Sequence, residues 1–243
     1  MALPPNERFR FFVFVIESPS PLDLYHRRSE GEIIQQAVNL NQIPCIVKTA
    51  INFQAFEASL KIGLKEAMDA FPGLVPILHI SAHGFQDGIE LSSGEKVMWA
   101  DLRAFFQPIN QALNHSLLVC LSCCEGYSGI RMAMTTESNE YPFFAIVANG
   151  AKPYWSETAV AYATFYHLIA KGEYIVDAVK AMCVASGNEY FWVQTAEEAR
   201  QGYLEYIQNI NTQQVQQQLE NNMAQEEPGH LEVLKKVSRG ITP

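Results

Sequence analysis

The sequence predicts an α/β fold, in which a mainly parallel sheet carries helices on both faces. Two observations support this. Short apolar runs such as FFVFVI, at 11–16, alternate along the chain with longer segments of helical spacing. The run FFVFVI contains no polar residue, which indicates a strand buried on both sides, as in parallel sheets.

The elements follow in order along the chain. Six strands are expected at 11–16, 43–51, 75–81, 116–124, 143–150 and 191–195, with a hairpin at 88–99 that turns at 92–94. Helices are expected at 29–40, 56–71, 100–113, 157–172 and 176–187. Ser29 and Glu32 form a capping-box pattern, Pro72-Gly73 ends the second helix, and Pro108 kinks or breaks the third.

The chain divides by composition near residue 195. Residues 1–195 form the α/β domain, and residues 196–243 form a polar, Gln- and Asn-rich helical extension that we expect to break at Pro228-Gly229. Two roles remain open for the extension, a helix laid against the sheet domain or an arm for docking or oligomerisation.

Composition excludes several classes of function. The formal net charge of −9 disfavours direct binding to nucleic acids or anionic membranes, which attract clustered Lys and Arg. No apolar run is long enough to span a bilayer, and the N-terminus resembles a first strand more than a signal peptide. Five cysteines, an odd number without metal-ligand spacing, predict a reducing, cytoplasmic location and no metal or other cofactor.

The candidate catalytic residues lie at the ends of two predicted strands. The third strand is followed by His83-Gly84, and the fourth ends in Cys123-Cys124. Ligands of open α/β sheets bind beyond the carboxyl ends of the strands, and adjacent strands lie about 5 Å apart. An imidazole beside a thiol is the pairing that nucleophilic thiol catalysis needs.

Glycine at position 84 suits the same chemistry. It has no Cβ to keep a substrate carbonyl from approaching the main chain, and backbone N–H donors stabilise the negative charge that develops on that oxygen. His79 and Cys120 lie inside their strands, so we expect them to be core residues.

The segments HISAHG, GIELS and LLVCLSCCEG together resemble the caspase-like cysteine peptidases, and within them the CHAT family (caspase HetF-associated with TPRs). Downstream, ATFYHLIAKGEYIVDAVKAM resembles the helix pair of that family, and FWVQTA resembles its closing strand. The resemblance covers residues from about 10 to 195 and implies a caspase-like sandwich around a mainly parallel six-stranded sheet.

By position, the resemblance implies that His83 is the general base, that Cys124 is the nucleophile, and that the N–H groups of Gly84 and Cys124 form the oxyanion hole. Cys123 takes the small-residue position of the family, and a redox role for it stays open. Ser122 stands where relatives that cleave after Arg or Lys often carry Asp. This substitution argues weakly against strict Arg or Lys specificity, unless Glu17 or Asp87 supplies the acid.

Two other segments depart from the family or bear on regulation. ANGAKPYW, at 148–155, replaces a Trp-Pro segment that is common in the family, so the substrate pocket is expected to differ. The segment 127–142 corresponds to the activation loop of caspase-like enzymes, and we expect it to be mobile in the resting protein.

The leading hypothesis is a regulated, bacterial cysteine endopeptidase that cleaves a protein partner through a thioester, with a role in stress or phage defence. An activating protein or subunit is an expected partner, and the oligomeric state is open. One alternative is a catalytically silent CHAT-like interaction module. Another is a thiol enzyme that acts on small metabolites.

Overall fold

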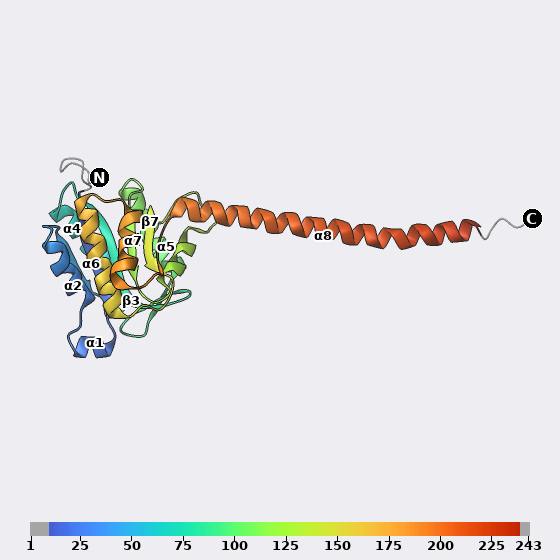
Figure 1. Cartoon of the computed structure of the whole chain (residues 1–243). Helices are drawn as coiled ribbons and strands as arrows, with labels where there is room; N and C mark the ends of the chain where they lie inside the picture. Colours follow the sequence, from blue (N-terminus) through green and yellow to red (C-terminus); the bar gives the residue numbers. More distant parts are fainter. Residues whose placement is uncertain (1–9, 239–243) are drawn as a thin grey trace, which may run out of the picture. The chain divides into compact units, whose positions relative to one another are not determined.

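The computed structural model describes the backbone of residues 10–238 and the side chains of residues 10–218 (Figure 1). The strands are β1 (Phe11–Ser18), β2 (Cys45–Thr49), β3 (Val75–Phe85), β4 (Gly88–Glu90), β5 (Lys96–Met98), β6 (Leu118–Ser122), β7 (Ala145–Asn149) and β8 (Phe191–Thr195). The helices are α1 (Pro21–Tyr25), α2 (Glu30–Asn39), α3 (Phe53–Ala58), the π-helical η1 (Ser59–Gly63), α4 (Leu64–Ala70), α5 (Trp99–Ala112), the 3₁₀-helical η2 (Gly126–Ala133), α6 (Trp155–Lys171), α7 (Ile175–Ser186) and α8 (Ala196–Ser238).

Six strands form the main sheet in the order β2-β1-β3-β6-β7-β8. All neighbouring pairs are parallel except β7 and β8, which are antiparallel. The predicted mainly parallel six-stranded sheet with helices on both faces is confirmed.

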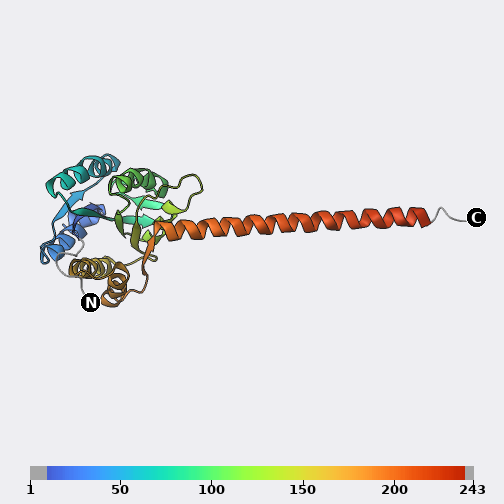
Figure 2. The ribbon, with the colours of Figure 1, turned by 90° about the horizontal axis from the view of Figure 1, so that it is seen from above.

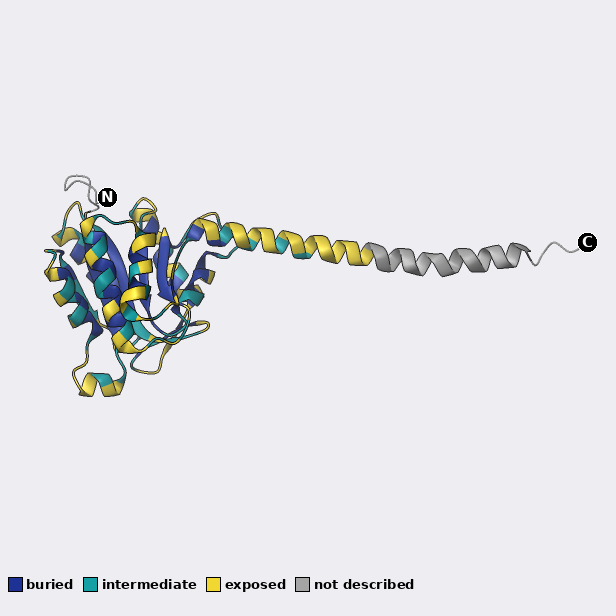
Figure 3. Cartoon of the chain, viewed as in Figure 1, coloured by how far each residue is buried: buried dark blue, intermediate teal, exposed yellow. Residues whose placement is uncertain are grey.

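Each face of the sheet has its own apolar core, as the uniformly apolar strands require. Along β1, Phe12 and Phe14 pack on one face with α3, η1, α4 and α5, whereas Val13 and Val15 pack on the other with α2, α6 and α7. Figure 2 shows these helices on opposite sides of the sheet, and Figure 3 shows the strands between them as buried.

Two elements differ from the sequence prediction. Strand β3 does not end at residue 81: it leaves β6 at the Ser81–Ser122 pair and continues to Phe85 by pairing with β4. The predicted turn after β1 contains the short helix α1, whose N-terminus is capped by the side chain of Ser20.

The predicted helix break at Pro228-Gly229 is wrong, since the backbone of α8 continues through these residues to Ser238. Pro108 likewise lies inside an uninterrupted α5. The chain divides into two compact units, residues 1–200 and 201–243. Within the second unit, Leu204, Ile207 and Val215 line a shallow groove on one face of the helix.

Candidate functional site

A pocket of about 270 Å³ opens at the carboxyl edge of the main sheet. Its walls come from the ends of β1, β3 and β6, from α1 and α2, and from the segment that leads into α6. The lining residues are Glu17, Ser18, Pro19, Ser20, Asp23, Arg28, Glu30, Ser81, Ala82, His83, Ser122, Cys123, Cys124, Pro153, Tyr154, Trp155 and Thr158.

His83 and Cys124 lie on the wall of this one pocket. They come together because β3 and β6 are adjacent and parallel, and because each residue lies two positions beyond the last paired residues, Ser81 and Ser122. His83 is exposed, and Cys124 is partly buried. The arrangement places a base and a thiol at a common opening, as thiol catalysis requires.

The Cys124 thiol is not prepared as a free thiolate in the resting protein. Partial burial raises the pKa of Cys124, while the Lys152 ammonium acts in the opposite direction. Lys152 also forms an ion pair of 3.5 Å with Glu125, so part of its charge is already compensated. Attack by this thiol therefore requires a base that removes its proton as the reaction proceeds.

Gly84 packs directly against the main chain that carries the thiol. A Cβ at position 84 would overlap the carbonyl oxygen of Cys124 and would lie 2.8 Å from its amide nitrogen. The close approach explains why glycine follows His83, a steric reason that the sequence alone did not provide. The roles of the Gly84 and Cys124 N–H groups as an oxyanion hole stay predictions.

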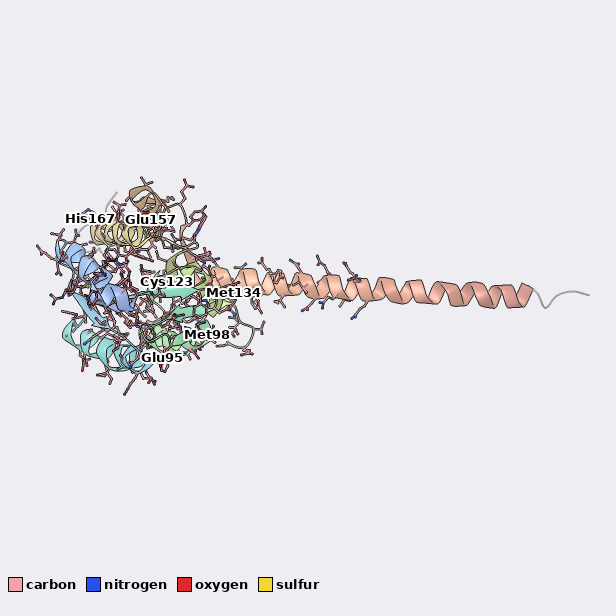
Figure 4. All side chains as sticks on the ribbon, turned by 90° about the horizontal axis from the view of Figure 1, so that it is seen from below. Glu95, Met98, Cys123, Met134, Glu157 and His167 are labelled. Carbon is pink, nitrogen blue, oxygen red and sulfur yellow. The ribbon has the colours of Figure 1, made fainter. Side chains whose placement is uncertain are left out.

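The two adjacent cysteines occupy different environments. Both line the pocket, but Cys123, labelled in Figure 4, is buried and also belongs to the core on the α5 face of the sheet, whereas Cys124 is only partly buried. Burial raises the pKa of the Cys123 thiol far above its ordinary value. Such a thiol is poorly reactive, and all five cysteines are free in the structure.

The three candidates for the substrate pocket separate in space. Ser122 and Glu17 line the pocket, but Asp87 does not, and its carboxylate pairs with Arg131 at 2.7 Å on the exposed β3–β4 turn. Glu17 accepts hydrogen bonds from the side chain of Ser29 and from the Gly31 N–H, so it fixes the start of α2.

Sequence reasoning missed the most buried acid of the pocket, Glu30. It is the first residue of α2, is only 3% exposed, and accepts a hydrogen bond of 2.7 Å from the Ser122 hydroxyl and another from Ser81. A signal was present in the sequence: Gly31 follows it, and a Cβ there would lie 2.6 Å from Val47 and 3.0 Å from Glu17. That glycine lets the start of α2 approach the strand ends closely.

The altered segment after β7 also contributes to the site. Pro153, Tyr154 and Trp155 line the pocket, and the carbonyl of Ala151 accepts a hydrogen bond of 2.7 Å from the N–H of Glu125. The departure from the family pattern at 148–155 therefore falls in the pocket wall. The predicted loop at 127–142 begins with η2, in which Ile130, Met132 and Ala133 are buried in the core.

Comparisons with known proteins identify no family for this chain. No family model and no curated protein matches the chain. A structure of the complex of the pro- and mature domains of RgpB from Porphyromonas gingivalis is similar over 76% of this chain, with 12% identity and a TM-score of 0.43. The chain spans about half of that protein, 47% of its length.

The described part of the chain shows no helix that is both long and apolar enough to cross a membrane. Within the same residues, no cluster of three or more His, Cys, Asp or Glu side chains is suited to hold a metal ion.

Proposed function

We propose that this protein is a cysteine endopeptidase that cleaves a protein substrate through a thioester of Cys124. The observation that carries the proposal is the position of His83 and Cys124 on the wall of one pocket at the carboxyl edge of neighbouring parallel strands. The resemblance of the surrounding sequence to CHAT peptidases supports it.

The reaction begins when His83 removes the proton from the Cys124 thiol and the sulfur attacks the carbonyl carbon of the peptide bond. The negative charge on the carbonyl oxygen is stabilised by the N–H groups of Gly84 and Cys124. The C–N bond then breaks, and the protonated imidazole gives its proton to the leaving amine. Water, deprotonated by His83, hydrolyses the thioester and restores the thiol.

The resemblance leads us to propose further that the activity is regulated, that an activating protein or subunit is a partner, and that the enzyme acts in bacterial stress or phage defence. The η2 segment packs against β6, the strand that leads to Cys124, and we propose that such a partner acts on η2 and on the residues that follow it, 134–142.

The test compares three variants with the wild type. A peptide that carries a thiol-reactive ketone should label Cys124 in the wild type and in Cys123→Ala, but not in Cys124→Ala, and His83→Ala should slow labelling strongly. Intact-mass spectrometry and peptide mapping identify the modified residue. A folded protein whose Cys124 reacts at the rate of a free cysteine, independently of His83, would favour the silent interaction module instead.

A further inference from the structure

The pocket beside Cys124 is acidic at its inner end and largely apolar along its walls. Glu30 and Glu17 are both buried, and Pro19, Ala82, Pro153, Tyr154 and Trp155 supply apolar surface. A volume of about 270 Å³ is smaller than that of most pockets for drug-sized ligands and suits one side chain. The pocket therefore combines apolar wall surface with buried acids.

Glu30 retains the capacity to bind a further donor. Its Oε1 accepts from Ser122, its Oε2 accepts from Ser81, and the side chain of Thr158 is a third hydrogen-bond partner. A carboxylate has about four acceptor sites in total, which leaves room for a further donor. An N–H group of a guanidinium or an ammonium can take that place, and its positive charge strengthens the bond.

The charge of Glu30 has no positive partner among the residues with described side chains. The ion pairs of this region involve other groups: Arg28, at the rim, pairs with Asp23 at 3.4 Å, and Lys152 pairs with Glu125. A neutral Gln could pair with the same two hydroxyl groups, accepting from one and donating to the other, without the desolvation cost of a buried charge. The Glu30 carboxylate is therefore suited to bind a cationic group of another molecule.

We propose that Glu30 is the specificity-determining residue of the pocket and receives the guanidinium or ammonium group of an Arg or Lys that precedes the cleaved bond, an inference that rests on the proposed peptidase function. The acid reaches the pocket from the start of α2 and not from strand β6, where Ser122 takes the place of an acid and positions Glu30 by donating to it. The absence of an acid at position 122 therefore does not argue against specificity for Arg or Lys, because Glu30, 92 positions earlier in the chain, supplies the acid.

Binding to the pocket is tested without catalysis. The nucleophile-free variant Cys124→Ala is titrated with n-butylguanidinium and with its neutral counterpart, n-butylurea, by calorimetry. The guanidinium should bind more tightly than the urea, and the double variant Cys124→Ala/Glu30→Gln should lose this preference. Equal binding of the two compounds to Cys124→Ala overturns the proposal.

Reaction with Cys124 is tested with two peptide ketones that differ only in Arg or citrulline before the reactive group. Wild type should be labelled at least about 30-fold faster by the Arg compound, and Glu30→Gln should label with both at similar rates. Thermal melting reports whether Glu30→Gln is folded. If it is not, Glu30→Asp should keep a reduced preference for Arg, and equal labelling of wild type by the two compounds would still overturn the proposal.

A third variant tests where the acid must lie. Glu30→Gln/Ser122→Asp returns an acid to the pocket from strand β6 and should recover a preference for Arg over citrulline.

Failure of the inference can be told apart from failure of the proposed function. Labelling of Cys124 by both ketones at equal rates overturns the role of Glu30 and leaves the peptidase. Binding of butylguanidinium through Glu30, with no labelling of Cys124 by either ketone, supports the cation pocket and contradicts the peptidase.

Discussion

The buried histidine His79 should make the stability of this protein sensitive to mild acid. It lies in the middle of β3, fully buried, and its Nδ1 shares a hydrogen bond of 2.9 Å with the hydroxyl of Tyr166. Its Nε2 has no partner among the described residues, and the ring of Tyr162 meets it edge-on with the centroids 4.6 Å apart. Neither tyrosine carries a negative charge that would stabilise an imidazolium, since burial raises the pKa of both.

The size of the effect follows from the pKa. Burial lowers the pKa of His79 to about 3 from an ordinary 6.5. The unfolded chain binds a proton at His79 more readily than the folded protein does. The free energy of unfolding is therefore undiminished by His79 above pH 6.5 and decreases as the pH falls toward 3. At about 1.36 kcal/mol for each pKa unit, the loss is about 3 kcal/mol by pH 4 and about 5 kcal/mol at completion. A typical domain has only about 5–15 kcal/mol in total.

The assay compares wild type with His79→Phe by denaturant unfolding between pH 4 and pH 8. Phenylalanine keeps a ring at this position, and its own packing cost does not change with pH. The free energy of unfolding of wild type, relative to that of the variant, should fall by about 3 kcal/mol between pH 6.5 and pH 4. Every other titrating group is common to both proteins, so parallel curves would refute the reasoning.

Three further predictions concern the site. Gly84→Ala should destabilise the protein by roughly 1–3 kcal/mol, because its Cβ would overlap the Cys124 carbonyl; an unchanged melting temperature would contradict this packing. Burial raises the pKa of Glu30, so butylguanidinium should bind to the Cys124→Ala protein more weakly as the pH falls, measured by calorimetry against Glu30→Gln. Other titratable groups interact with Glu30 (Glu17, Cys123 and Tyr162) or line the same pocket (Asp23, His83 and Cys124), and a pH response that persists in Glu30→Gln would assign the effect to them. Hydrogen exchange should be faster in residues 134–142 than in η2, whose apolar side chains are buried, and uniform protection would argue against a mobile activation loop.

The arrangement of the sheet could be predicted because its strands carry a strong local signal. Strands such as FFVFVI and SLLVCL are apolar throughout, and the rule that parallel strands end at one edge then places His83 and Cys124 near each other. The adjacency of β3 and β6 was an assumption of that argument, and the structure shows it.

Glu30 could not be predicted in the same way, because its function depends on contacts between distant residues. In the sequence it is an ordinary acidic residue in the first turn of a helix, where the positive end of the helix dipole favours it. Only the packing of α2 against the sheet turns the side chain inward, to hydroxyl groups on β3 and β6 that lie 51 and 92 positions away.

The continuation of β3 past Ser81 was missed for a related reason. The segment after His83 contains Gly84, Gln86 and Asp87, which weaken a strand signal, and it becomes a strand because β4 offers it a pairing partner. This pairing fixes the backbone on both sides of His83, since His83 itself pairs with Glu90. A residue held in a ladder has less freedom than one on a loop, so His83 and Glu30 are positioned by regular elements, β3 and α2, whereas Cys124 lies in the turn just after β6.

The end of β6 places the adjacent residues Ser122, Cys123 and Cys124 in three different environments. Side chains alternate along β6, so Ser122 contacts Glu30 while the next side chain, Cys123, packs into the core on the other side, and Cys124 follows in the turn at the pocket. In the proposed function, specificity and chemistry are thereby connected through residues 122–124, so a change that moves Ser122 would also move Cys124, the proposed nucleophile. Substitutions at Ser122 should therefore change the reaction rate of Cys124 as well as its preference for a basic residue, whereas Glu30→Gln should change mainly the preference. Equal loss of rate with Arg and citrulline compounds in Glu30→Gln would show that the acid only holds α2 in place.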